Sequence, residues 1–287
     1  LKLGNAAGIL LQVGWREIQE SMRIPTAFIS HGGGPCFFMK WTMGPENTWD
    51  ATRESLSQLL AHLPASPQAI LVVSAHWEES SVHVTAHPNP PLLFDYYGFP
   101  EHTYQLQWPA PGSPALAQRI QDLLRAAGIA CVSDEQRGFD HGVFIPLKVA
   151  VPNADIPTVA VSLKRSLSPA EHWALGNALA PLRDEGVFIV GSGFSYHSMG
   201  GFNCDGGRKH AEAFTTWLDQ AVLAPAGERQ QMLLQWEEAP SARACHPREE
   251  HLLPLMVAVG AAAGDTKTSI LFAGNVMGVP SRSYLFG

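Results

Sequence analysis

Short apolar runs rich in β-branched residues alternate with helical stretches along most of this chain, and this alternation restricts the fold more than any other feature. The predicted strands occupy residues 26–30, 69–74, 158–163 and 187–190. Strands that alternate with helices form a sheet whose two faces are both covered by helices. We therefore predict an α/β fold with a central, mostly parallel sheet flanked by helices, and an active site at the carboxyl ends of the strands.

The helical stretches between these runs have recognisable patterns. Residues 168–185 are predicted to form a helix, because Ser168, Pro169 and Glu171 make a capping-box start. Another helix precedes the second strand, where four leucines recur at helical spacing: Leu56, Leu59, Leu60 and Leu63. We predict one catalytic domain over residues 23–287, preceded by an extension at 1–22. The proline-rich connection at 88–111 is expected to be irregular and functional.

Composition excludes several classes of protein. Of the 287 residues, 46% are hydrophobic, which is enough for a large core, and the net charge of -7 without a basic run disfavours nucleic acid as a partner. The apolar run at 8–13 is too short to span a bilayer, so we expect no membrane partner. Four scattered cysteines indicate reduced thiols in a cytoplasmic protein: Cys36, Cys131, Cys204 and Cys245.

Histidines follow three of the predicted strands. His31 follows residues 26–30, His76 follows 69–74, and His197 lies just beyond 187–190. The carboxyl ends of parallel strands converge at one edge of a sheet, so three imidazoles from distant parts of the sequence can share one ion. Two further candidates for such a site are His141, which lies between glycines, and His251, which lies at the start of an apolar helix.

The other seven of the twelve histidines lack such a setting: His62, His83, His87, His102, His172, His210 and His246. His62 and His172 are predicted to be solvated. Neutral imidazoles suit iron, zinc, copper or nickel, and a site rich in histidine with no cysteine pair favours catalysis over a closed structural zinc site. Esterase chemistry is excluded because no serine lies in a G-x-S-x-G elbow beside His31 and its glycines.

The chain resembles the class III extradiol ring-cleaving dioxygenases (catalytic B-subunit type), in their DOPA-4,5-dioxygenase-like branch, from about Pro25 to the C-terminus. The segments that carry the resemblance are Ser30-His31-Gly32, Ser74-Ala75-His76-Trp77, Phe94-Asp95-Tyr96-Tyr97-Gly98-Phe99-Pro100, Trp108-Pro109-Ala110-Pro111-Gly112-Ser113, Phe139-Asp140-His141-Gly142 and Glu250-His251-Leu252-Leu253-Pro254-Leu255. One departure is Gly33-Gly34, where the branch commonly has a serine after the first His-Gly.

The resemblance implies roles for the five histidines. It implies metal ligation by His31, His76 and His251, with His197 as general base and possible fourth ligand, and a substrate- and oxygen-contacting role for His141. The implied cofactor is one Fe(2+) or Zn(2+) per chain, and the implied partners are a small aromatic diol and O2. Two alternatives remain open: a zinc hydrolase that activates water with the same cluster, and a non-catalytic metal-binding relative.

Overall fold

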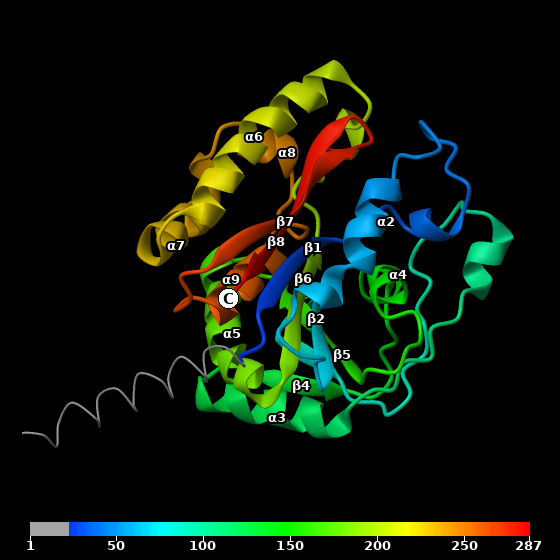
Figure 1. Cartoon of the computed structure of the whole chain (residues 1–287). Coiled ribbons are helices and arrows are strands. Elements are labelled where there is room, and N and C mark those ends of the chain that lie inside the picture. The colour runs from blue at the N-terminus through cyan, green and yellow to red at the C-terminus, as the bar shows by residue number, and fades with distance from the viewer. Residues whose placement is uncertain (1–22) are drawn as a thin grey trace, which may run out of the picture.

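The computed structural model describes residues 23–287, which form an α/β fold around one mixed sheet (Figure 1). Among these residues the sheet has eight strands in the order β4-β3-β5-β2-β6-β1-β8-β7. The strands are β1 (Thr26–Ser30), β2 (Ala69–Glu79), β3 (Val82–Thr85), β4 (Cys131–Asp134), β5 (Thr158–Lys164), β6 (Val187–Gly193), β7 (Thr268–Val276) and β8 (Val279–Phe286). The predicted extension at 1–22 lies outside the described residues.

The pairs β1–β6, β6–β2, β2–β5 and β3–β4 are parallel, and the carboxyl-terminal hairpin β7–β8 adds antiparallel strands beside β1. The helices are α2 (Asp50–Ser57), α3 (Pro114–Ala126), α4 (His141–Ala150), α5 (Pro169–Leu179), α6 (Asp205–Leu223), α7 (Ala226–Leu234), α8 (Ala242–Cys245) and α9 (Leu253–Ala261). The predicted α/β fold with a mostly parallel sheet is confirmed.

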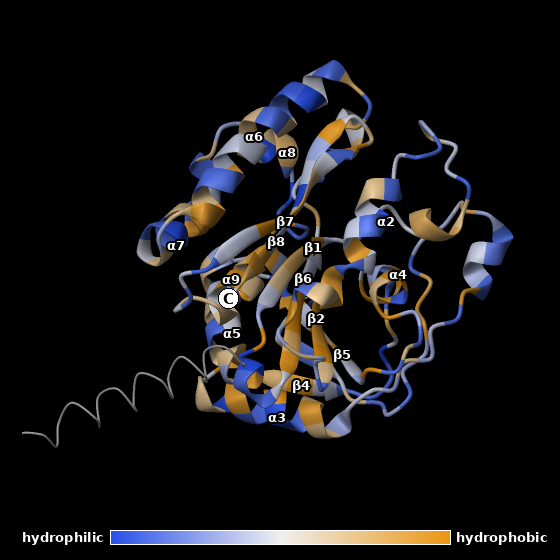
Figure 2. Ribbon diagram, in the orientation of Figure 1, coloured by the Kyte–Doolittle hydropathy of each residue, from blue (hydrophilic) through white to orange (hydrophobic). Residues whose placement is uncertain are grey.

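Both faces of the sheet are buried. In β2, Ile70 and Val72 pack into one core while Leu71 and Val73 pack into the other, and all four side chains are at most 1% exposed. Helices α3, α5 and α9 cover one face, and α2 and α4 cover the other (Figure 1). The central strands are accordingly apolar along their length, as buried parallel strands require (Figure 2).

Ser168 is the N-cap of α5, since its hydroxyl accepts a hydrogen bond from the amide of Glu171. The reciprocal bond of the predicted capping box is not formed, because the Glu171 carboxylate contacts Lys164 and Ser166 instead. The α-helix ends at Leu179, and a 3₁₀ turn (Ala180–Glu185) that contains Pro181 completes the predicted segment. A 3₁₀ turn (Leu59–His62) likewise finishes the leucine pattern that begins in α2. The long connection at 88–111 is irregular as predicted, apart from one 3₁₀ turn (Glu101–Gln105).

One strand and two histidines differ from the sequence-based expectations. Strand β6 continues to Gly193, three residues beyond the predicted end at Val190. His76 lies inside β2 rather than in a turn after it, because the strand continues to Glu79 through an irregularity between Val73 and Glu78. His172 is completely buried rather than solvated. His172 lies in the first turn of α5. Its Nδ1 atom contacts the Ser168 carbonyl at 2.8 Å, and its Nε2 atom accepts a hydrogen bond from the Lys164 amide of β5 at 3.1 Å.

Within residues 23–287, no helix combines the length and the apolar character needed to cross a bilayer.

Candidate metal centre

The adjacent ends of β1 and β6 bring His31 close to the turn that carries His251. Ser30 pairs with Gly193 in the sheet, and the amide of His31 donates to the Gly193 carbonyl at 3.2 Å. The turn that carries His251 lies directly against the same strand end, because the amide of Phe194 donates to the His251 carbonyl at 2.9 Å. A Cβ atom at Gly193 would lie 2.1 Å from that carbonyl oxygen, so only glycine permits this approach.

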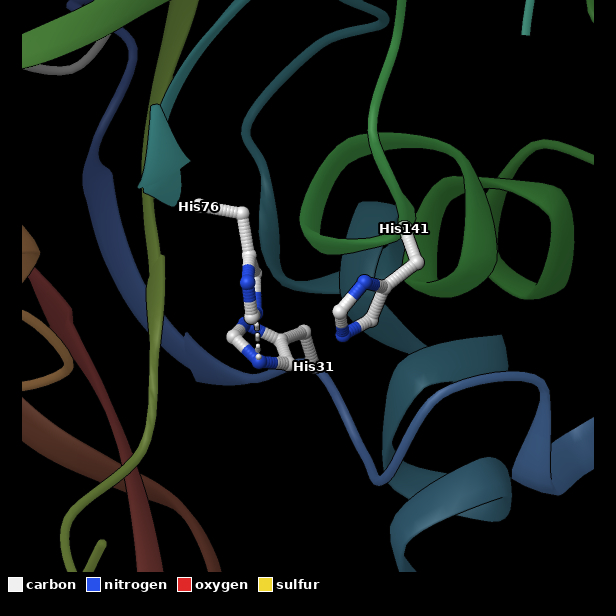
Figure 3. A group of neighbouring side chains, drawn as sticks. All are labelled: His31, His76 and His141. Atoms are coloured by element: carbon white, nitrogen blue, oxygen red, sulfur yellow. Dashed lines mark hydrogen bonds between the residues drawn. The ribbon is translucent and has the colours of Figure 1, made fainter. Parts of the chain in front are cut away.

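All five predicted histidines meet in one place. The ring centre of His31 lies 4.9 Å from that of His76, 5.4 Å from that of His141 and 5.2 Å from that of His251. His197 stacks on His251 with ring centres 3.3 Å apart. Figure 3 shows the rings of His31, His76 and His141 turned toward one another, from just after β1, from β2 and from the start of α4.

The ring nitrogens and one carboxylate form two groups that could each hold an ion. The first contains His31, His76 and His141, whose ligand atoms lie within 4.8 Å of one another, and the second contains His197, Glu250 and His251 with the same spacing. The Nε2 atoms of His31 and His76 are 3.1 Å apart. This separation fits two nitrogen ligands of one ion, each bonded at about 2.1 Å.

Hydrogen bonds hold the rings of His31 and His141 from behind, and a carboxylate lies near the ring of His76. The Nδ1 atom of His31 lies 3.2 Å from the Ser192 hydroxyl, which itself donates to the backbone of α4. His141 is held twice by Asp95, whose Oδ1 accepts from the backbone amide at 2.9 Å and contacts Nδ1 at 2.8 Å. The other Asp95 oxygen lies 3.7 Å from Nδ1 of His76. Such outer partners orient imidazoles and leave Nε2 free for a ligand.

Glu250 orients the other two histidines of the site, His251 and His197. Its Oε1 atom lies 2.9 Å from Nδ1 of His251 and 3.2 Å from Nδ1 of His197. Arg248 bridges this carboxylate to Glu78 on β2. Burial favours the neutral acid, but the hydrogen bond and charge of His197 outweigh it and lower the pKa of Glu250. The charged carboxylate therefore fixes both rings.

The irregular part of β2 is held by a buried polar network. The Ser74 hydroxyl accepts from the His76 amide at 3.2 Å and donates to Asp140 at 2.7 Å. Arg137 pairs with Asp140 at 3.0 Å and donates to the His76 carbonyl at 3.2 Å. Burial and the nearby Asp95 raise the pKa of Asp140. These contacts explain why His76 projects from within the strand.

The imidazoles of His31, His76 and His251 are neutral near pH 7. Burial, reinforced by neighbouring histidines, lowers the pKa of His31 and His251 well below the usual value and lowers the pKa of His76 to about 3. Neutral rings offer the lone pairs that a metal ion needs. Nitrogen and carboxylate donors without a thiolate suit Fe(II) or Zn(II), so the residues present fit either ion.

A cavity of about 250 Å³ opens over the histidines. All five form part of its wall, together with the glycine run at 32–34 and side chains of Trp, Phe and Met. The remaining histidines, such as His62 and His246, lie outside this wall. Sequence reasoning missed Asp95, Glu250 and Ser192 as supports of the imidazoles. Asp95 and Glu250 lie within the quoted motifs, which was the available signal.

This arrangement defines an α/β protein with a candidate metalloenzyme site at the carboxyl ends of its strands. The family described as the catalytic LigB subunit of aromatic ring-opening dioxygenase matches residues 25–287. The chain belongs to this family of class III extradiol dioxygenases, which confirms the resemblance found in the sequence.

Two relatives named as DOPA dioxygenases and one solved structure are similar to this chain over most of their length. The 4,5-DOPA dioxygenase extradiol of Beta vulgaris is 39% identical over 249 residues, covering 86% of this chain and 90% of the relative. That of Escherichia coli K12 is 34% identical over 264 residues, covering 91% and 93%. The crystal structure of an uncharacterized E. coli K12 protein has a TM-score of 0.75 at 32% identity, covering 92% of this chain and 100% of that one.

Proposed function

We propose that this chain is an extradiol dioxygenase that inserts both atoms of O2 into a catechol-type substrate at a divalent metal ion. The observation that carries the proposal is the convergence of five imidazoles from five separate segments on one cavity. Membership of a ring-opening dioxygenase family and the similarity to DOPA dioxygenases support the reaction class.

His31, His76 and His251 are the proposed ligands. When bound, Fe(II) supplies a Lewis acid that orients a catechol and O2 for reaction. His31, His76 and His141 form the closer group of ligand atoms, so the assignment of His251 over His141 requires a direct test. His251 lies nearly as close to the first two rings, at 5.2 and 4.9 Å between ring centres.

His197 and His141 are the proposed catalytic residues. His197 has its Nδ1 on the Glu250 carboxylate, which leaves Nε2 to accept a proton from a phenolic hydroxyl. His141 is held by Asp95 in the same way, so its Nε2 is free to hydrogen-bond an oxygen atom of the reactants. Each carboxylate stabilises the protonated ring that would result from proton transfer.

Replacement of single histidines tests the ligand assignment. His31→Ala, His76→Ala and His251→Ala are expected to lose bound iron, because each removes one of three nitrogen ligands. His141→Ala and His197→Ala are expected to retain iron but lose at least about a hundredfold in turnover, the usual contribution of a general acid or base. Metal analysis after anaerobic iron loading measures the first effect, and an oxygen electrode with catechols measures the second.

His62→Ala is the matched control, because His62 is exposed on the 3₁₀ turn after α2. Thermal unfolding of each variant separates loss of a ligand from loss of the fold. Iron loss from His141→Ala with retention by His251→Ala would reverse the ligand assignment.

A zinc hydrolase is the second candidate, since an all-histidine ligand set is equally suited to zinc. A hydrolase consumes no oxygen. Stoichiometric oxygen uptake with a catechol supports the dioxygenase, and its absence in iron-loaded protein overturns it.

A further inference from the structure

The part of the cavity wall that is not formed by histidines is apolar. Met43, Met199 and Met277 line it, with aromatic rings that include Phe99 and Phe202. Among the described residues, 23–287, the lining contains no Lys, Arg, Asp or Glu. The indole nitrogens of Trp41 and Trp49, which also line it, are buried from solvent and so present no donor surface to a ligand.

The charged groups behind the histidines offer no cationic partner to a ligand in the cavity. Asp95 and Glu250 both lie beneath the imidazoles, where their carboxylate oxygens face Nδ1 atoms of the histidines rather than the cavity. The two arginines that contact this layer are already paired, Arg137 with Asp140 and Arg248 with Glu78 and Glu250. Met43 and Met199 are 51% and 70% exposed, so an anionic group placed against them would keep part of its water, but the cavity wall offers it no cationic partner.

Met43, Met199 and Met277, here called the methionine rim, lie on loops that hydrogen bonds hold together. Met43 follows the glycine run, Met199 begins a 3₁₀ turn (Met199–Gly201), and Met277 occupies the turn of the β7–β8 hairpin. Asn203 joins two of these loops, because its amide donates to the Met277 carbonyl at 2.7 Å and its side chain donates to the Met43 carbonyl at 3.3 Å. Its φ of 56° is one that asparagine tolerates better than most residues.

The volume restricts the ligand further. Typical ligand pockets occupy roughly 300–1,000 Å³, whereas this cavity is about 250 Å³. Gly34, with a φ of 54°, lies against the ring of Phe99, so its missing side chain adds no empty space. A single aromatic ring with a short substituent is the size of ligand that such a cavity accepts.

We propose that the substrate is a single-ring catechol with a short, uncharged, apolar substituent that contacts Met43, Met199 and Met277. The diol faces the histidines and the substituent faces the methionines, whose flexible thioethers pack well on aromatic and aliphatic groups. This inference rests on the proposed function for the diol but concerns a different wall of the cavity. It predicts rejection of the amino-acid side chain that DOPA carries.

A matched pair of ligands tests the proposal. 4-Propylcatechol and 3-(3,4-dihydroxyphenyl)propionate have the same chain length and differ in a terminal methyl or carboxylate, while DOPA and dopamine add an ammonium group. Quenching of tryptophan fluorescence in zinc-loaded protein measures binding without turnover. Propylcatechol is expected to bind at least about tenfold more tightly than each charged analogue, because its terminal methyl gains apolar contact with the methionines while a charged group finds no partner in the wall.

Equal or tighter binding of the propionate, DOPA or dopamine would overturn the proposal. Oxygen uptake by iron-loaded protein is measured with the same ligands. Selective binding of propylcatechol without oxygen uptake would contradict the dioxygenase function and leave the specificity of the pocket supported. Oxygen uptake that favours a charged catechol would support the function and refute the specificity.

A charge placed on the rim gives a second test. Met199→Arg introduces a cation at a residue that is 70% exposed, and should tighten binding of the propionate roughly three- to fivefold relative to propylcatechol. Val132→Arg is the control, because Val132 is also an exposed apolar residue but lies on β4, at the opposite edge of the sheet from β7. An equal response from both variants would show that the substituent does not contact Met199.

Discussion

Glu250 holds two histidines of the site with a single oxygen atom. Its Oε1 contacts Nδ1 of both His197 and His251, while Arg248 pairs with the same carboxylate. A proposed ligand and a proposed base are therefore oriented by one residue. The adjacent Glu249 points elsewhere and pairs with Arg243 at 2.5 Å.

Glu250→Gln is expected to weaken metal affinity by roughly 10- to 100-fold, because the amide keeps the size of the side chain but loses the charge that orients His251. Competition with a chelator for bound zinc measures the affinity. Glu249→Gln removes a neighbouring carboxylate that contacts no histidine and should leave the affinity unchanged. Equal affinities for all three proteins would argue against an orienting role for Glu250.

At the scale of elements, the site depends on close contact between β6 and the segment that leads into α9. Gly193 lies under the His251 carbonyl, and Gly191 lies equally close to the Pro254 carbonyl, where a Cβ would be 2.2 Å away. Glycine at these two positions allows the backbone that carries His251 to rest directly on the strand.

Gly193→Ala is expected to destabilise the protein by about 1–3 kcal/mol, the usual cost of overpacking, and to release the metal by displacing His251. Urea unfolding and metal analysis measure the two effects. Gly206→Ala in the first turn of α6 is the control, because a Cβ there meets nothing within 4 Å. Unchanged stability and metal content in Gly193→Ala would mean that the His251 turn can move without consequence.

At the scale of the whole molecule, stability depends on histidines that fold in the neutral form. His246 is fully buried against the rings of Phe214 and Trp236, with Nε2 3.1 Å from the Ser195 carbonyl. Burial lowers its pKa to about 3, and burial also lowers the pKa of His172. Neither residue belongs to the cavity wall.

The free energy of unfolding should therefore fall as the pH falls below 6.5. In that range the unfolded chain binds a proton at His246, while the folded chain excludes it down to about pH 3. This single residue contributes a slope of up to about 1.4 kcal/mol per pH unit. His246→Gln cannot titrate, so urea unfolding between pH 6 and pH 4.5 should show a shallower slope by that amount. An unchanged slope would mean that His246 is protonated in the folded protein.

The sequence by itself was sufficient for features that depend on near neighbours. The apolar runs predicted β1 and β5 to within one residue and the start but not the end of β6, and the cap at Ser168 predicted the start of α5. The rule that parallel strands end at a common edge was enough to group His31, His76 and His197. Such patterns are readable because strand, cap and turn preferences are set by residues only a few positions apart.

Only the tertiary structure decided which side chains support the histidines and which residues line the rest of their cavity. Asp95 supports His141 and Glu250 supports His197 through contacts that depend on how loops cross the end of the sheet. The burial of His172, the extension of β2 through His76, and the meeting of Met43 with Met277 across one cavity were equally hidden. Each requires segments far apart in sequence to pack together, and packing depends on the order of strands and the path of loops rather than on local preference.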